Sequence, residues 1–100
     1  MTVLRLTPRA LAHLERIADH LRALEVADVE VRLAEILDAL QLLRSHPLIG
    51  RSSGGVQREL VIGRGARGYV ALYGYDAARD EVVVNALRAQ REAGFREGMD

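Results

Sequence analysis

The sequence contains no cysteine and no tryptophan, and its only aromatic residues are three tyrosines and one phenylalanine in 100 residues. The absence of cysteine excludes a disulfide framework, a thiolate nucleophile and a thiolate metal site. No signal peptide is evident, and no apolar run is long enough to span a membrane. We therefore expect a soluble, cytoplasmic protein that makes no membrane contact.

Lysine is absent as well, so all 14 basic residues are arginine. Arginine keeps its charge and presents a planar fork that suits phosphate or carboxylate, but it is a poor proton shuttle. The formal net charge is zero, yet residues 44–75 hold five arginines and one acid, Glu59. This composition favours the binding of an anionic partner over proton chemistry.

The length fits one domain, residues 1–100. Val3 to Leu6 predicts a short strand, after which Thr7 can cap a helix and Pro8 suits its first position. A second helix begins after Asp28 and runs to about residue 44, so the two helices form an antiparallel hairpin. The expected apolar stripes are Leu11, Leu14, Ile17, Leu21 and Leu24 in the first helix and Val31, Ala34, Leu37, Leu40 and Leu43 in the second.

Three strands are predicted in the second half, over residues 58–62, 69–75 and 81–87. The last is the richest in β-branched residues and is the expected central strand. The fold class is therefore α+β in the order β-α-α-β-β-β, with the helical hairpin packed on one face of a small, mainly antiparallel sheet. The core is expected to include Leu14, Leu21, Leu37, Leu40 and Val83.

Arginines and tyrosines interleave along these strands and predict a binding surface. Its members are Arg58, Arg64, Arg67, Arg88 and Arg91 together with Tyr69, Tyr73 and Tyr75. Guanidinium forks and aromatic rings in alternation could hold phosphates and stack on bases. The alternative is that the tyrosines are half-buried strand residues and the arginines form a solvated rim.

Enzymatic chemistry finds little support in the residue types. His13, His20 and His46 lie in the first half without metal-ligand spacing, so we expect no metal and no cofactor. The glycine-rich segment 63–68 joins two strands and does not open a helix, which argues against a phosphate-binding loop. The second half has no histidine or lysine to move a proton, so a nuclease built from it would be handicapped.

The predicted helical hairpin from Pro8 to Leu43, followed by four segments in this order and spacing, resembles the RelE/ParE superfamily of toxins from type II toxin–antitoxin modules over nearly the full chain. The four segments are His46-Pro47-Leu-Ile-Gly50, Arg58-Glu-Leu60, Gly68-Tyr-Val-Ala-Leu-Tyr73 and the run from Val82 to Phe95. The resemblance implies a compact α+β toxin that is neutralised by a cognate antitoxin in a hetero-oligomer. RelE-type members cut messenger RNA on the ribosome, whereas ParE-type members poison DNA gyrase.

The resemblance also implies roles for particular residues. Arg58, Arg67, Tyr73, Arg88 and Arg91 would be the catalytic set of a RelE-like nuclease. The expected target- or antitoxin-binding residues are Arg58, Arg64, Arg67, Tyr69, Tyr73, Arg88, Arg91 and Phe95. Close relatives commonly have histidine where Ala89 stands and tyrosine where Phe95 stands, so two groups that could transfer protons are missing.

The favoured interpretation is a non-enzymatic toxin directed at DNA gyrase, because the long hairpin and the Pro47–Gly50 corner are typical of that branch. The alternative is a ribosome-dependent messenger RNA endoribonuclease, which would make the chain an enzyme. A third possibility is an attenuated or non-toxic basic interaction domain.

Overall fold

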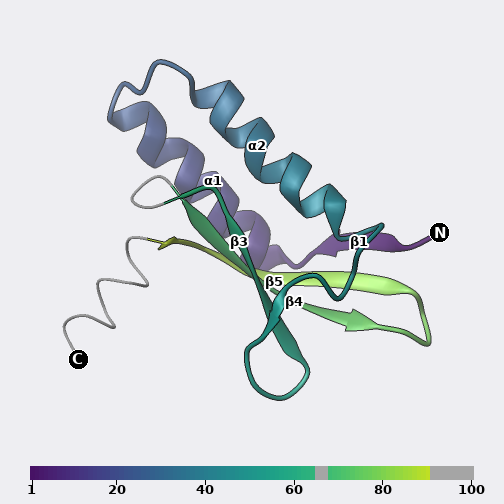
Figure 1. Cartoon of the computed structure of the whole chain (residues 1–100). Coiled ribbons are helices and arrows are strands. Elements are labelled where there is room, and N and C mark those ends of the chain that lie inside the picture. The colour runs from purple at the N-terminus through teal and green to yellow at the C-terminus, as the bar shows by residue number, and fades with distance from the viewer. Residues whose placement is uncertain (65–67, 91–100) are drawn as a thin grey trace.

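The computed structural model describes residues 1–64 and 68–90, and it confirms the predicted α+β class (Figure 1). Two helices lie against one face of a sheet. The elements are β1 (Val3–Leu6), α1 (Pro8–Ala23), α2 (Val29–Leu42), β2 (Arg51–Ser52), β3 (Gln57–Ile62), β4 (Tyr69–Asp76) and β5 (Glu81–Ala89). The two-residue strand β2 is the one element in this order that the sequence did not predict.

The ends of the helices follow local chemistry. The Thr7 side chain accepts a hydrogen bond from the backbone N–H of Ala10 at 3.1 Å, and Pro8 occupies the first helical position, as predicted. Asp28 precedes α2, but its side chain makes no capping hydrogen bond. Glu25, in the left-handed region with φ 54°, turns the chain between the two helices.

The predicted apolar stripe of α2 is partly wrong. Leu40 and Leu43 are buried, but Leu37 is 45% exposed and Ile36 is buried in its place. Two overlapping rows of apolar residues run along this helix, and both are spaced correctly for a packed face. The sheet covers the row that contains Ile36 and leaves Leu37 on the outer side.

The sheet order is β1-β5-β4-β3-β2, with β1 parallel to β5 and the other pairs antiparallel. The middle strand is therefore β4. The prediction that residues 81–87 form the central strand is wrong, because β5 lies one position away from the middle of the sheet. The helical hairpin carries the chain from β1 at one edge of the sheet to β2 at the opposite edge. The next three strands then return one by one toward β1, so the first strand pairs with the last. A register shift interrupts the β4–β5 pairing between Leu72 and Tyr73.

The core lies between the helices and the sheet. Its largest fully buried side chains are Tyr73, Ile36, Leu40, Leu43, Leu87, Val82 and Val84. Val83, expected in the core, is only half-buried because neighbouring residues of a strand point to opposite faces. Within residues 1–64 and 68–90, no helix has both the length and the apolar character needed to cross a membrane.

Candidate functional site

The strand residues of the predicted binding surface lie on two different faces of the sheet. Arg58 is the register partner of Tyr73, and Tyr69 is the partner of Ile62, so these residues share the face that the helices cover. Arg88 is paired with Val70, which neighbours Tyr69 in β4 and so points to the opposite face. The arginines and tyrosines predicted to form a binding surface are therefore divided between the two faces of the sheet.

Burial also changes the interpretation of the tyrosines. Tyr73 has no exposed surface, and Tyr69 is only 8% exposed. The prediction that these two rings offer a stacking or binding surface is wrong for this conformation, because the helices already cover them. Tyr75 is half-buried, as the alternative interpretation of the tyrosines predicted.

Arg58 and Tyr73 instead hold the corner between α2 and β2, which comprises residues 46–50. Nη1 of Arg58 donates to the carbonyl oxygen of Gly50 at 2.7 Å and to that of Leu48 at 3.2 Å. The hydroxyl oxygen of Tyr73 accepts a hydrogen bond from the backbone N–H of Gly50 at 2.9 Å. The side chains of two sheet residues thus hold the backbone of the corner through hydrogen bonds.

Gly50 sits where no other residue fits without a rearrangement. A Cβ atom at this position would lie 2.7 Å from the carbonyl oxygen of Glu59 and 2.7 Å from both Cε1 and Oη of Tyr73. The close approach lets the tyrosine hydroxyl reach the backbone N–H. The glycine of the Pro47–Gly50 segment is therefore explained by packing against Tyr73.

The side chains of this corner point outward and are largely apolar. Leu48 is 58% exposed and Ile49 is 51% exposed. Together with His46 and Pro47 they line an open hollow of about 440 Å³. A corner whose backbone is fixed from inside therefore presents two large apolar side chains to solvent.

The remaining predicted site residues are distributed as follows. Arg64 and Arg88 are exposed, and neither forms an ion pair with any residue that the structure describes. Ala89 is the register partner of Tyr69 at the end of β5. The predicted positions Arg67, Arg91 and Phe95 lie outside the described residues.

His13 was not recognised as a site residue from the sequence, yet the fold brings it to β5. Its Nδ1 accepts a hydrogen bond from the backbone N–H of Leu87 at 3.1 Å. β1 ends before this point, so α1 supplies the acceptor at this edge of β5. In residues 1–64 and 68–90, no three histidine, aspartate or glutamate side chains are grouped so as to hold a metal ion.

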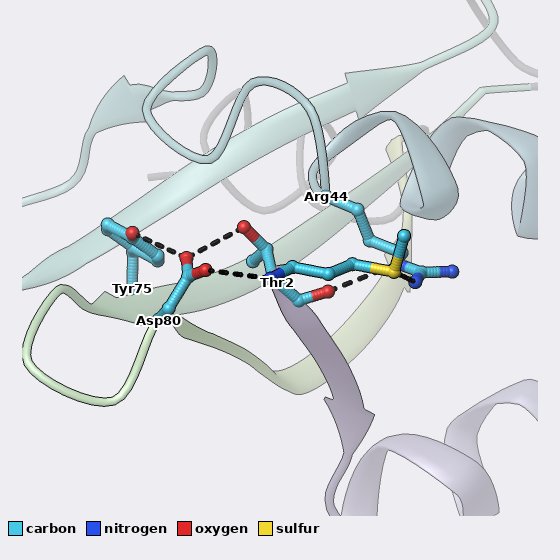
Figure 2. A network of polar contacts seen from close by, with 5 residues as sticks. Thr2, Arg44, Tyr75 and Asp80 are labelled. Carbon is cyan, nitrogen blue, oxygen red and sulfur yellow. Dashed lines mark hydrogen bonds and ion pairs between the residues drawn. The ribbon is translucent and has the colours of Figure 1, made fainter.

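A second polar cluster, shown in Figure 2, ties the N-terminal segment to the turn between β4 and β5. One carboxylate oxygen of Asp80 accepts from the Thr2 hydroxyl at 2.7 Å and from the Tyr75 hydroxyl at 2.8 Å. The N-terminal amine lies 3.9 Å from the other oxygen. Nε of Arg44 donates to the Thr2 carbonyl oxygen at 3.1 Å, on the other side of the segment.

These contacts shift two pKa values in opposite directions. The hydrogen bonds from Thr2 and then Tyr75 lower the pKa of Asp80 below its ordinary value of 3.8. The hydrogen bond to Asp80 raises the pKa of Tyr75 above 10.0, and partial burial adds to that effect. The cluster is thus most stable with a charged aspartate and a neutral tyrosine.

Comparison with known proteins identifies the class to which this fold and this chain belong. The family model of the ParE toxin of the type II toxin–antitoxin system parDE matches residues 4–94. The chain therefore belongs to the ParE toxin family, within the RelE/ParE superfamily of toxins. A search of curated proteins gave no match.

Two solved structures share the fold. A chain of the chromosomal ParDE toxin–antitoxin system from P. aeruginosa aligns with a TM-score of 0.74 and 22% identity, covering 89% of this chain and 96% of that chain. A chain of the RelBE2 toxin–antitoxin complex from Mycobacterium tuberculosis aligns with a TM-score of 0.62 and 20% identity, covering 89% and 98%. These likenesses extend the fold assignment over most of each chain.

Proposed function

We propose that this ParE-family toxin acts on DNA gyrase without catalysing a reaction itself, and that a cognate antitoxin protein neutralises it in a hetero-oligomer. The two structural neighbours come from toxin–antitoxin systems, which supports an antitoxin as the partner. Membership of the ParE toxin family supports DNA gyrase as the target over the ribosome.

The observation that carries the non-enzymatic proposal is the position of Tyr73. This residue would supply the hydroxyl of a RelE-like catalytic set, but it has no exposed surface and binds the Gly50 N–H. Arg58, of the same set, uses its guanidinium to hold two backbone carbonyls. In this conformation the Tyr73 hydroxyl is not available to a messenger RNA, and Nη1 of Arg58 is already bound to the corner, which argues against the nuclease.

The ribosome-dependent nuclease is kept as the second candidate because Arg64 and Arg88 are exposed. Neither has a carboxylate partner among the described residues, so both could contact phosphates. An attenuated or non-toxic binding domain is the third candidate, and it would leave growth unaffected.

The test is controlled induction of the chain in cells, with and without the adjacent reading frame, followed by mapping of messenger RNA ends and DNA breaks. We expect growth arrest and DNA breaks with the toxin alone, and normal growth when the adjacent product is made as well. RNA cuts in phase with codons would establish the nuclease instead. Normal growth in both cultures would contradict a toxin.

Two controls separate a specific effect from the burden of expression. The same gene with an early stop codon controls for transcription and for the vector. A Leu40→Asp variant places a charge at a core position that is 1% exposed and should not fold. Arrest by either control would show that the phenotype does not come from the folded toxin.

A further inference from the structure

The corner at residues 46–50 combines exposed apolar side chains with an unusually constrained backbone. Leu48 and Ile49 are each more than half exposed, and burial of such side chains is normally favourable. Exposed apolar residues are common on protein surfaces. These two differ because they sit on a segment that other residues fix in place.

The constraint comes from four hydrogen bonds and one close packing contact. Arg58 contributes two bonds and the Tyr73 hydroxyl accepts one, while the Ile49 N–H donates to the His46 carbonyl oxygen at 3.1 Å. Gly50 packs directly on the tyrosine ring. A segment held in this way loses little conformational entropy when a partner binds, which raises affinity for a given contact area.

The charge around the corner indicates the chemistry of that partner. Arg44 precedes it, Arg51 follows it and Arg58 lies beneath it, whereas Glu59 is the one acid between residues 44 and 64. The guanidinium groups of Arg44 and Arg58 contact carbonyl, amide or thioether groups and no carboxylate among the described residues. The Arg51 side chain is 72% exposed, and its Nε forms an ion pair with Oε1 of Glu59 at 3.3 Å.

We propose that the Leu48–Ile49 corner docks an acidic segment of the antitoxin that carries apolar anchor residues, and that Arg58 and Tyr73 are positioning residues for this corner. The apolar side chains would fill the partner's contact patch, and the flanking arginines would attract its carboxylates. This inference rests on the proposed function, because it assumes that the chain has an antitoxin.

The first test replaces both apolar side chains. The purified toxin with Leu48→Ser and Ile49→Ser is titrated with the purified product of the adjacent reading frame. We expect the dissociation constant to rise about tenfold or more, with no change in melting temperature, because both residues are exposed. The matched control is Leu24→Ser with Val31→Ser, which alters two residues of similar exposure, 61% and 59%, elsewhere on the helical hairpin.

The second test separates positioning from direct contact. Arg58→Met is measured in the unaltered toxin and again in the Leu48→Ser, Ile49→Ser background. A positioning residue should weaken binding about tenfold in the first case and add nothing in the second, because the side chains it positions are already gone. An equal loss in both backgrounds would mean that Arg58 contacts the antitoxin itself and would overturn its positioning role.

The remaining outcomes distinguish this inference from the proposed function. Unchanged antitoxin affinity of the corner variant would overturn the docking proposal. If that variant also stopped arresting growth, the corner would be a contact for the cellular target instead. If the unaltered toxin neither bound the adjacent product nor arrested growth, the proposed function itself would fail, and the docking proposal with it.

Discussion

Tyr73 has two structural roles, because its ring fills the core and its hydroxyl group holds the backbone of the corner at residues 46–50. Its ring is fully buried between the sheet and the helices, and its hydroxyl reaches the Gly50 N–H. A buried tyrosine hydroxyl usually finds a partner of this kind. The residue therefore links the core to the shape of an exposed corner 23 residues earlier in the chain.

The Tyr73→Phe variant should be destabilised by about 1–3 kcal/mol, because the buried N–H of Gly50 loses its acceptor. The measurement is urea unfolding followed by circular dichroism. Tyr69→Phe is the matched control, since that tyrosine is also buried but its hydroxyl has no hydrogen-bond partner among the described residues. Equal stability of the two variants would show that the Tyr73 hydroxyl contributes nothing.

At the residue scale, the sequence predicted which residue types would gather on the strands but not which way they point. Arg58 and Arg88 were assigned to one face, and the structure places them on opposite faces. The register between β3, β4 and β5 decides this, and a one-residue change reverses a side chain. A sequence without an alignment gives no direct information on that register.

At the scale of elements, the helices and the longer strands were predicted close to their observed bounds, because capping residues and periodicity are local signals. The parallel β1–β5 pair and the two-residue strand β2 depend on contacts between distant parts of the chain. The choice between the Ile36 and Leu37 rows of α2 is likewise made by tertiary packing. Local sequence signals therefore predict neither the pairing of distant strands nor the buried face of α2.

The Asp80 cluster joins β1 to the β4–β5 turn and should make stability depend on pH. Because the pKa of Asp80 is lowered in the folded state, its contribution is complete above the ordinary value of 3.8 and is lost as the pH falls through the lower folded value. Tyr75 affects stability in alkali instead. Because its pKa is raised in the folded state, its contribution to stability is complete below 10.0 and is lost as the pH rises through the higher folded value.

We expect Asp80→Asn to destabilise the protein at neutral pH and to lose most of this difference from the unaltered protein in acid. Asparagine tolerates the left-handed conformation at this position, φ 52°, so the backbone need not change. The measurement is thermal unfolding across pH 2 to 7. Asp19→Asn, in an exposed surface pair, is the control and should change little at any pH. A constant difference across the pH range would contradict a role for the charged carboxylate.

At the scale of the whole molecule, the zero net charge conceals an uneven distribution. Among the described residues between 44 and 64 there are four arginines and one glutamate. A local excess of one sign attracts an oppositely charged partner over a distance set by the salt concentration. Encounter with the proposed acidic segment of the antitoxin should therefore be faster than the net charge alone indicates.

This predicts that the association rate constant of toxin and antitoxin falls as salt rises from about 0.1 M to about 1 M, where the Debye length shrinks from ~10 Å to ~3 Å. The dissociation rate should change much less. Surface plasmon resonance over a salt series measures both. Arg44→Gln with Arg51→Gln should flatten the salt dependence, whereas Arg16→Gln on α1 should not. An association rate independent of salt would contradict electrostatic attraction at this surface.

The pairing of the first strand with the last has a consequence for how the chain folds during synthesis. β1 hydrogen-bonds to β5, and α1 packs on β5 as well, so the N-terminal quarter has no sheet partner until residues 81–89 have been made. Contacts this distant in sequence slow folding, because a long loop must close before they form. A nascent chain on the ribosome therefore stays incompletely folded until residues 81–89 have emerged, and activity that depends on the finished sheet begins only after that point.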